Sequence, residues 1–581
     1  MTKQKIPLES LEKLKLKWLS FWPEAIEIWS KYLKLSDPRF CLTKEEENKE
    51  HLLSSFAMIR LDDHAVVISL RQVAQYELED YPLEIMCHEI GHHIYCPADL
   101  TDHGRLIARI RRAIPGYESE APLIANLYGD LLINDKLKRE HGLRLDDVYK
   151  KIGGDSVDKM WTFYLRIYEI LWGLTKNTLA KGEITSIMEG DAQLGNRIIR
   201  NFSNDWLEGA GRFASLCYPY LVEEGTSKIR SIMSPLLDSQ ETGSGSTFPS
   251  GLSEIEEGEL SGAKHPSLDG EIKENNAGED HTKVGNAAGQ YREPFEYGAI
   301  LKALGLTMSQ EEITIQYYKE RSMPYLIPFP TKETPVSKEP LMEGLDIWDI
   351  GSPFENIDWF QTAMRSPVVI PGFTTVEQIF GVSEGSLPEK EPVDLDIYID
   401  CSGSMPNPGY NISYLALAGT IITLSALRVG SRVQATLWSG PKEFYTTNGF
   451  ISDEKELLKV VTGYLGGSTA FPIHILRETY TDRKPNARKV HILVISDEGV
   501  TTMFDKDEKK NSGWDISEMS LKNCGGGGTF VLNLYSDWQT DKSLVRANQQ
   551  GWDMHRVNDW EALVKFAKEF SNKKYGSEAN G

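Results

Sequence analysis

An acidic, glycine-rich stretch in the middle of the chain divides the sequence into parts that have to fold separately. Residues 238–290 hold eleven Asp and Glu against three Lys, together with nine Gly and almost no aromatic residues. Such a composition buries too little apolar surface to offset the entropy lost on ordering. We therefore expect a disordered acidic linker at 236–292 between a domain at 1–235 and a domain at 391–575, with a helical and extended connecting segment at 293–390.

The overall charge and the cysteines narrow the class of protein. The 581-residue chain has a net charge of −22, which disfavours non-specific binding to nucleic acid or to an anionic membrane. The longest apolar run is shorter than the roughly 20 residues that a membrane-spanning helix needs. Six scattered cysteines without a CxxC pair are typical of reduced thiols in a cytoplasmic protein.

The N-terminal domain contains a histidine pair with the spacing of a zinc site. Two short β-type runs at 56–61 and 65–70 precede a helix that carries His88, Glu89 and His92 in an HExxH pattern. Histidines four residues apart project from one face of a helix, so both imidazoles can hold one Zn²⁺. Glu89 is placed to take a proton from a zinc-bound water and deliver it to the leaving group. The pattern therefore predicts a zinc-dependent hydrolase with Glu89 as its base.

A third zinc ligand is expected on the next long helix. Apolar residues line one face of that helix, and Asp130 falls in the middle of this face between Asn126 and Asn134. A carboxylate in apolar surroundings is costly unless a cation or several donors meet it. We therefore expect Asp130 to complete the zinc site, with Asn134 or Asn126 orienting its carboxylate.

Other side chains near the HExxH pattern offer alternatives. Glu118 and Glu120 are the alternative third ligands. Cys87 and Cys96 flank the pattern, but thiolate ligands would favour a closed structural site over an open catalytic one. A third histidine six residues after the second would indicate a metzincin, and Ala98 occupies that position.

The segments 88–93 (HEIGHH) and 125–134 (ANLYGDLLIN) resemble the active-site helices of a bacterial family of zincin-like metallopeptidases. Members of this family carry a C-terminal von Willebrand factor A (VWA)-like domain. The resemblance implies a mainly helical, zincin-like α+β domain at 1–235 that hydrolyses peptide bonds.

A second metal site is predicted in the C-terminal domain. A buried strand at 393–399 ends in Asp400, Ser402 and Ser404 (DxSxS), and an almost wholly apolar helix follows at 412–427. Carboxylate and hydroxyl oxygens on one tight loop suit a hard divalent cation. Strands alternate with helices through the rest of the domain, which indicates a doubly wound α/β sheet. The further strands are expected at 432–438, 489–496, 529–535 and 553–557.

This DxSxS pattern resembles the metal-ion-dependent adhesion site (MIDAS) of VWA domains, which have a Rossmann-like fold. The resemblance implies that a Mg²⁺ or Mn²⁺ ion is held by five side chains: Asp400, Ser402, Ser404, Thr469 and Asp497. It also implies a protein partner that completes the coordination of the ion with a carboxylate. In resembling bacterial families such proteins work beside a MoxR-type AAA+ ATPase. This chain has no GxxxxGK[ST] loop of its own for a nucleotide.

Three functions follow from these patterns. The first is a zinc metallopeptidase whose VWA domain docks a partner or substrate through the MIDAS cation. The second is a non-catalytic adaptor, in which the VWA domain binds and a degenerate zincin-like domain serves as a scaffold. The third is a self-processing switch, because a polar, exposed linker is easily cleaved.

Overall fold

The chain forms two compact units, which are described separately. The computed structural model describes residues 7–52, 55–61, 63–152, 156–224, 248–259, 290–326, 331–334, 338–384, 389–484, 487–559, 561–563, 565–566 and 570. The first unit comprises Met1–Glu320 with Gly409–Ile412, and the second comprises Arg321–Pro408 with Ser413–Gly581. No helix in this described part of the chain has the length and apolar character needed to cross a bilayer.

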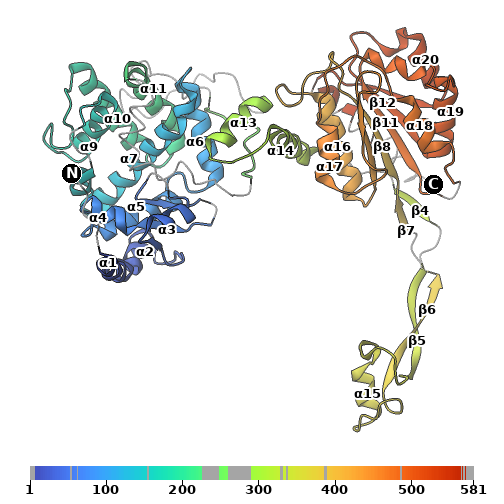
Figure 1. Cartoon of the computed structure of the whole chain (residues 1–581), viewed down its shortest axis with the longest axis horizontal. Helices are drawn as coiled ribbons and strands as arrows, with labels where there is room; N and C mark the ends of the chain where they lie inside the picture. The colour runs from blue at the N-terminus through green and yellow to red at the C-terminus, as the bar shows by residue number, and fades with distance from the viewer. Residues whose placement is uncertain are drawn as a thin grey trace, which may run out of the picture. The chain divides into compact units, whose positions relative to one another are not determined.

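The first unit is mainly helical (Figure 1). Its helices are α1 (Leu8–Ser20), α2 (Trp22–Trp29), α3 (Lys44–Lys49), α4 (Leu70–Gln75), α5 (Pro82–Ile94), α6 (Leu100–Ala113), α7 (Ala121–His141), α8 (Leu145–Ile152), α9 (Lys159–Leu171), α10 (Ser186–Asn201), α11 (Trp206–Glu224), α13 (Pro294–Ala303) and α14 (Gln310–Ser322). A small sheet has the order β1 (Arg39–Cys41), β3 (Val66–Ser69), β2 (Ala57–Ile59). Strands β2 and β3 pair antiparallel, and they lie in the two β-type runs predicted at 56–61 and 65–70.

Helices α5 and α7 form the centre of the first unit. Helix α5 begins at Pro82, whose fixed φ suits a first helical turn. Helix α7 ends where Gly142 takes a left-handed conformation, with φ 70°. The sequence predicts one apolar face on α7, yet every residue from Ala121 to Asp135 is buried. Asp130 therefore lies inside the unit and not only on the buried side of a surface helix.

Part of the expected linker is ordered within the first unit. Most of 236–292 lies outside the described residues, but 248–259 and 290–292 are described. Leu252 is fully buried, as is Glu259. The Glu256 carboxylate pairs with Arg109 of α6 at 2.6 Å, and Arg292 donates to Glu259 at 2.6 Å. The expectation of a disordered linker is wrong for these two pieces, because ion pairs and one buried leucine tie them to the helices.

The second unit is built around a six-stranded, mostly parallel sheet (Figure 1). The strand order is β10 (Phe444–Thr446), β9 (Val433–Trp438), β8 (Asp394–Asp400), β11 (Val490–Ser496), β12 (Gly525–Leu532) and β13 (Trp552–Arg556). Only β10, at one edge of these six strands, runs antiparallel to its neighbour. The helices of this part are α16 (Tyr414–Arg428), α17 (Glu454–Val461), α18 (Ile473–Tyr480), α19 (Gly513–Cys524) and α20 (Lys542–Gln549).

Helices cover both faces of this sheet. Figure 1 shows α16 and α17 on one face, and α18, α19 and α20 on the other. Strands β8, β9 and β11 are buried along their whole length, as expected for a parallel sheet enclosed by helices. The expected α/β organisation is therefore confirmed as a mixed, mostly parallel sheet with helices on both faces.

The segment that precedes the sheet forms two short antiparallel ribbons. One pairs β4 (Thr331–Thr334) with β7 (Glu389–Pro392). The other pairs β5 (Lys338–Ile347) with β6 (Val376–Glu384), and helix α15 (Trp359–Arg365) lies between them in sequence. The expected connecting segment at 293–390 is thus divided, because α13 and most of α14 belong to the first unit.

Candidate functional site

The close packing of α5 on α7 positions the first site. A Cβ atom at Gly91, inside the HExxH pattern, would lie 2.5 Å from the Ile133 side chain and 2.8 Å from Trp29. No side chain fits at such distances, so glycine is required where α5 meets α7 and α2. This approach brings the histidines of α5 to Asp130 of α7.

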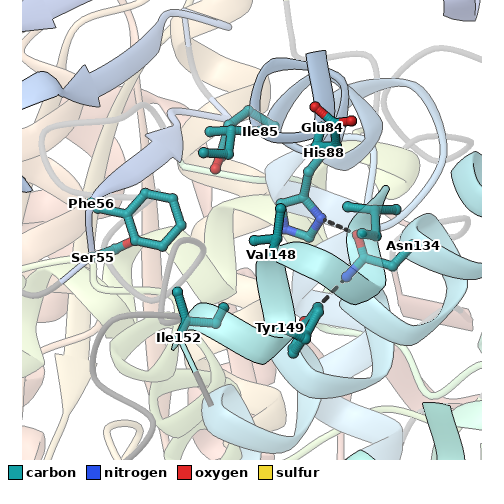
Figure 2. Close-up of a pocket in the computed structure, with 11 residues that line it drawn as sticks. Ser55, Phe56, Glu84, Ile85, His88, Asn134, Val148, Tyr149 and Ile152 are labelled. Atoms are coloured by element: carbon teal, nitrogen blue, oxygen red, sulfur yellow. Dashed lines mark hydrogen bonds between the residues drawn. The ribbon is translucent and has the colours of Figure 1, made fainter. Parts of the chain in front are cut away.

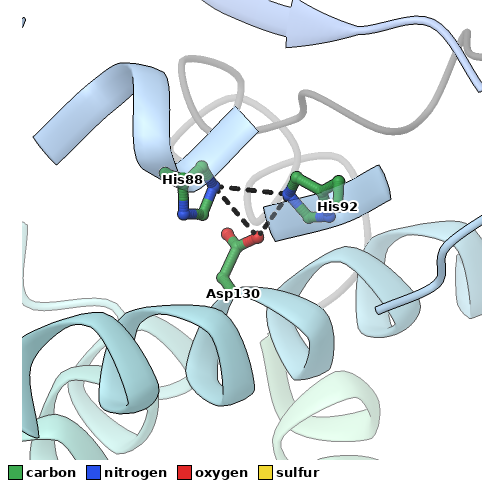
Figure 3. Close-up of side chains that lie close together, drawn as sticks. All are labelled: His88, His92 and Asp130. Carbon is green, nitrogen blue, oxygen red and sulfur yellow. Dashed lines mark hydrogen bonds and ion pairs between the residues drawn. The ribbon is translucent and has the colours of Figure 1, made fainter. Parts of the chain in front are cut away.

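Three side chains converge on one point between these helices (Figure 3). The Nε2 atoms of His88 and His92 are 3.3 Å apart. The Oδ1 atom of Asp130 is 3.6 Å from the first Nε2 atom and 3.4 Å from the second. These three residues form a group that could hold a metal ion, and they are the three ligands predicted from the sequence.

The remaining hydrogen bonds of the histidines direct their lone pairs towards this point. The Nδ1 atom of His92 lies 3.0 Å from the carbonyl oxygen of Cys96. A carbonyl oxygen only accepts, so His92 carries a hydrogen on Nδ1, and in the neutral ring this leaves the lone pair on Nε2. The Nδ1 atom of His88 lies 2.8 Å from Oδ1 of Asn134, which assigns the same tautomer. Two imidazoles and a carboxylate oxygen that face one another form a group that could hold a cation.

The spacing of the three atoms fits a tetrahedral ion. Ligand atoms about 2.0–2.1 Å from a four-coordinate zinc ion lie about 3.3–3.4 Å from one another. The observed separations are 3.3, 3.4 and 3.6 Å. Two imidazoles and one carboxylate also leave a fourth position for water or a substrate, as in open zinc sites.

Asn126 holds the carboxylate of Asp130 in place. Its Nδ2 atom donates to Oδ2 of Asp130 at 3.0 Å, so Oδ1 remains directed at the histidines. The sequence left open whether Asn126 or Asn134 would orient Asp130. The structure assigns this contact to Asn126, and Asn134 bonds His88 instead.

The alternative ligands lie outside the His88–His92–Asp130 group. Glu118 and Glu120 form a short 3₁₀ helix before α7, and the Glu118 carboxylate accepts from the backbone N–H of Gly116 at 2.9 Å. The Cys87 thiol faces the carbonyl oxygen of Ala25. Burial raises the pKa of the Cys96 thiol well above its usual value, so its thiolate is disfavoured.

His88 lines a small cavity (Figure 2). Glu89 is also among the lining residues. The cavity has a volume of about 30 Å³, which is space for about two waters. The side chain of His88 is 14% exposed, against 2% for His92. Access to the three ligand atoms is therefore from the His88 side. The walls are mostly apolar, and the apolar residues are Phe56, Ile85, Leu145, Val148 and Ile152.

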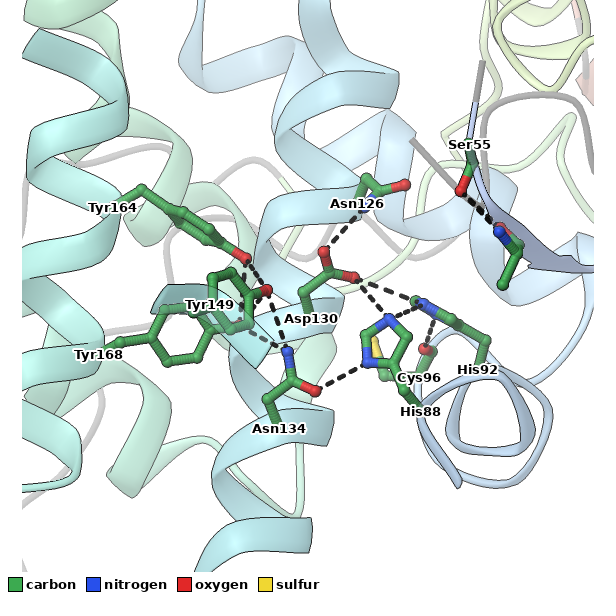
Figure 4. Close-up of polar contacts among 11 residues, drawn as sticks. Ser55, His88, His92, Cys96, Asn126, Asp130, Asn134, Tyr149, Tyr164 and Tyr168 are labelled. Carbon is green, nitrogen blue, oxygen red and sulfur yellow. Dashed lines mark hydrogen bonds and ion pairs between the residues drawn. The ribbon is translucent and has the colours of Figure 1, made fainter. Parts of the chain in front are cut away.

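A cluster of tyrosines behind Asn134 was not predicted from the sequence (Figure 4). The Nδ2 atom of Asn134 donates to the hydroxyls of Tyr149, at 3.2 Å, and Tyr168, at 2.8 Å. The hydroxyl of Tyr164 contacts both of these hydroxyls, at 3.3 and 3.1 Å. Burial raises the pKa of Tyr164 and Tyr168 well above its usual value, so both keep their hydrogens. The i, i+4 spacing of two polar side chains on the apolar helix α9 was the signal in the sequence.

The second predicted site lies where β8 and β11 end. These strands are parallel neighbours. The chain continues from β8 to β9 on one side and from β11 to β12 on the other, and open α/β sheets bind ligands at such a switch point. The hydroxyl of Ser404, after β8, donates to Oδ2 of Asp497, after β11, at 2.5 Å. The hydroxyls of Ser402 and Ser404 are 3.2 Å apart, and Oδ1 of Asp400 accepts from the backbone N–H of Ser402 at 2.9 Å. Four of the five predicted side chains are thus joined in one hydrogen-bonded group.

Thr469 lies close to the same group. A Cβ atom at Gly499 would lie 2.4 Å from the Thr469 side chain, and the backbone N–H of Gly499 donates to Asp497 at 2.7 Å. Burial raises the pKa of Asp400, and the nearby charge of Asp497 adds to this. Two carboxylates and several hydroxyls at one loop cluster form an oxygen-rich donor set that suits a hard cation.

Cys401 lies inside this loop without taking part in the oxygen group. Its thiol faces the carbonyl oxygen of Trp438 at 3.2 Å, and burial raises its pKa to about 12. The thiol is therefore neutral.

Comparison with known proteins gives no family, and among solved structures it gives partial likenesses. No protein-family model matches the sequence, and no curated protein matches it. Among solved structures, the pilus adhesin SpaC from Lactobacillus rhamnosus GG is similar over 32% of this chain and 30% of that chain, with 12% sequence identity and a TM-score of 0.23. The chain thus spans less than a third of the adhesin's length in this match, and a likeness at this TM-score carries no conclusion about fold or function.

Proposed function

We propose that the protein is a zinc-dependent metallopeptidase whose second unit binds a protein partner through a divalent cation. The observation that carries the first part is the convergence of three ligand atoms, from His88, His92 and Asp130, within 3.3–3.6 Å of one another. Their tautomers and spacing fit an open, four-coordinate zinc site.

The residues around this site supply the parts that hydrolysis needs. A zinc ion with an open position polarises a carbonyl and lowers the pKa of a bound water. Glu89 follows the first ligand on α5, is buried and lines the cavity beside His88. It is therefore positioned to accept a proton and to return it to the leaving amine.

The chemical character of the cavity lining supports a peptide as the proposed substrate. Its polar end consists of His88, Glu89, Asn134 and Tyr149, and its walls are mostly apolar. The Glu84 carboxylate, also in the lining, is paired with Arg144 at 3.1 Å, so its charge is already matched. The chemical character of such walls favours an apolar side chain next to the scissile bond.

The strand order and the loop residues of the second unit support the proposal that it is a VWA-like domain with a MIDAS. Numbered along the chain, the six strands lie in the order 3-2-1-4-5-6, the doubly wound order. Asp400, Ser402, Ser404 and Asp497 gather at the loops after its two central strands. A Mg²⁺ or Mn²⁺ ion there would leave coordination positions for a carboxylate of a partner, and a MoxR-type AAA+ ATPase is the partner that the family resemblance proposes.

The small cavity favours one alternative function. A volume of about 30 Å³ admits water more readily than a side chain. A non-catalytic adaptor, with a zinc-stabilised first unit as scaffold, would need no larger opening.

Measurement of zinc and of proteolysis on the full-length chain separates the two functions. We expect about one zinc per chain and slow cleavage of fluorescein-labelled casein by the wild type. Glu89→Gln should keep the zinc and lose cleavage, whereas Glu118→Gln, which changes a carboxylate outside the ligand group, should keep both. Bound zinc without any cleavage that depends on Glu89 would leave the adaptor as the function.

A further inference from the structure

Asn134 links His88 to a closed ring of three hydroxyl groups (Figure 4). We call the hydroxyls of Tyr149, Tyr164 and Tyr168 the hydroxyl ring, because each is within 3.1–3.3 Å of the other two. The ring adds three contacts to the three made by Asn134, one to His88 and two to ring members. Among themselves, these five side chains therefore make six contacts.

The observed orientation of Asn134 supplies one hydrogen to each of these contacts. Each hydroxyl donates to the next around the ring, which uses three hydrogens for three contacts. The two amide hydrogens of Asn134 serve Tyr149 and Tyr168, and the sixth hydrogen is on Nδ1 of His88.

The reversed amide supplies fewer hydrogens than the contacts need. If Asn134 were turned about its side-chain axis, its oxygen would face Tyr149 and Tyr168. The three hydroxyl hydrogens would then have to serve five contacts, so two would have none. The amide nitrogen would face Nδ1 of His88, and that atom would have to accept, which moves the ring hydrogen to Nε2. A histidine with its hydrogen on Nε2 has no lone pair there for a metal.

We propose that the hydroxyl ring is a positioning device that selects the metal-binding tautomer of His88. The ring turns the Asn134 oxygen towards His88, the oxygen holds the hydrogen on Nδ1, and the Nε2 lone pair is left for the ion. Hydrogen-bond partners behind metal-binding histidines act in this way in other sites, but here the orientation is set one residue further away. The inference rests on the metal site of the proposed function and is independent of peptidase chemistry.

Single hydroxyl deletions distinguish this role from simple packing. In Tyr168→Phe three contacts remain, and they join Tyr164 to Tyr149, Tyr149 to Asn134, and Asn134 to His88. Either orientation of Asn134 supplies a hydrogen to each of these contacts. The preference for one tautomer is lost. In Tyr164→Phe, four contacts remain, and only the observed orientation supplies all four. Both tyrosines lie on α9 and are fully buried, so the second variant is a matched control.

The test is the zinc affinity of full-length protein, measured by competition with a chromophoric zinc chelator. Loss of a hydrogen-bonded partner behind a ligand lowers metal affinity about 10–100-fold. We expect a loss in the lower part of this range for Tyr168→Phe, and a change of less than about three-fold for Tyr164→Phe. Circular dichroism of each metal-free variant reports whether the first unit is folded.

A rescue variant provides a readout that packing would not change. The side chain introduced by Asn134→Asp offers only acceptors, so it holds a hydrogen on Nδ1 of His88 whichever way it turns. In that background, adding Tyr168→Phe should change zinc affinity by less than about three-fold.

Equal losses in Tyr164→Phe and Tyr168→Phe, or a loss that persists in the double variant, would overturn the positioning role. Absence of zinc from the wild type would overturn both this inference and the proposed function. Zinc binding without casein cleavage would overturn only the peptidase.

Discussion

The Nε2 atom of His92 lies 3.4 Å from the Oδ1 atom of Asp130, although the two residues belong to different helices. Both side chains are almost completely buried, with 2% and 1% of their surfaces exposed. A cation shared between the carboxylate and the two imidazoles would offset the cost of burying these groups together. The same arrangement accounts for the expected behaviour of several variants.

Replacement of Asp130 should remove the metal without unfolding the first unit. Asp130→Asn keeps the volume and a hydrogen-bonding group but removes the charge that faces the histidines. We expect zinc affinity to fall by more than the roughly 100-fold that loss of an outer partner costs. Zinc titration of the full-length variant checks this, and zinc affinity within a few-fold of the wild type would show that Asp130 is not a ligand.

Zinc should stabilise the first unit and leave the second unchanged. A ligand at 100 times its dissociation constant stabilises the folded state by about 2.7 kcal/mol. Denaturant unfolding with and without zinc, followed by the fluorescence of single-tryptophan variants of each unit, measures this. His92→Ala is the control and should show no zinc-dependent shift.

Gly91→Ala should weaken both packing and metal binding. The added methyl would meet Ile133 and Trp29 at 2.5 and 2.8 Å, so α5 must move away from α7. Overpacking of this kind costs about 1–3 kcal/mol, and the same movement separates the histidines from Asp130. We expect a lower unfolding midpoint together with weaker zinc binding, and a normal zinc affinity would contradict the close-packing account.

The oxygen group of the second unit should bind Mg²⁺ or Mn²⁺ independently of zinc. Asp400→Ala and Ser404→Ala remove members of the hydrogen-bonded group, so we expect Mn²⁺ binding, followed by electron paramagnetic resonance, to fall at least ten-fold. Asp505→Asn, an exposed carboxylate a few residues after Asp497, removes the same charge outside the group and should leave Mn²⁺ binding unchanged. Equal effects of all three variants would indicate non-specific attraction to acidic residues.

Asp396 should make the second unit less stable as pH rises. Burial raises its pKa to about 7, against the hydrogen bonds of Tyr480, Tyr398 and Gln434, which lower it. Between about pH 4 and pH 7 the folded state therefore holds a proton that the unfolded state has released, so stability is greatest near pH 4 and falls towards pH 7. One pKa unit corresponds to about 1.4 kcal/mol.

Asp396→Asn isolates this contribution, because the amide does not titrate. We expect the difference in unfolding free energy between the two proteins to change by a few kcal/mol across this pH range. A difference that stays constant from pH 4 to pH 7 would contradict the buried, protonated state.

The parts of the site that depend on local periodicity were predictable from the sequence. Four-residue spacing places His88 and His92 on one helical face, and a charged residue on an apolar helix face indicated Asp130. The strand-then-DxSxS pattern likewise placed Asp400 at the end of a buried strand. In each case the chemistry is encoded within one element.

The parts that depend on contacts between elements were not predictable. Whether Asn134 bonds Asp130 or His88 is decided by how α7 packs against α5, and the tyrosines reach it from α8 and α9. The order of residues 248–259 likewise depends on arginines of α6, which a composition argument does not include. Composition indicates how much apolar surface a segment can bury by itself. It does not include the ion pairs and packing contacts that another segment provides.

The most direct test of the central claim is X-ray absorption at the zinc edge of the full-length, zinc-loaded protein. A site formed by His88, His92 and Asp130 predicts two imidazoles and further oxygen ligands, all at about 2.0–2.2 Å. A sulfur ligand at about 2.3 Å would assign the metal to Cys87 or Cys96, and a single imidazole would contradict the shared site on α5.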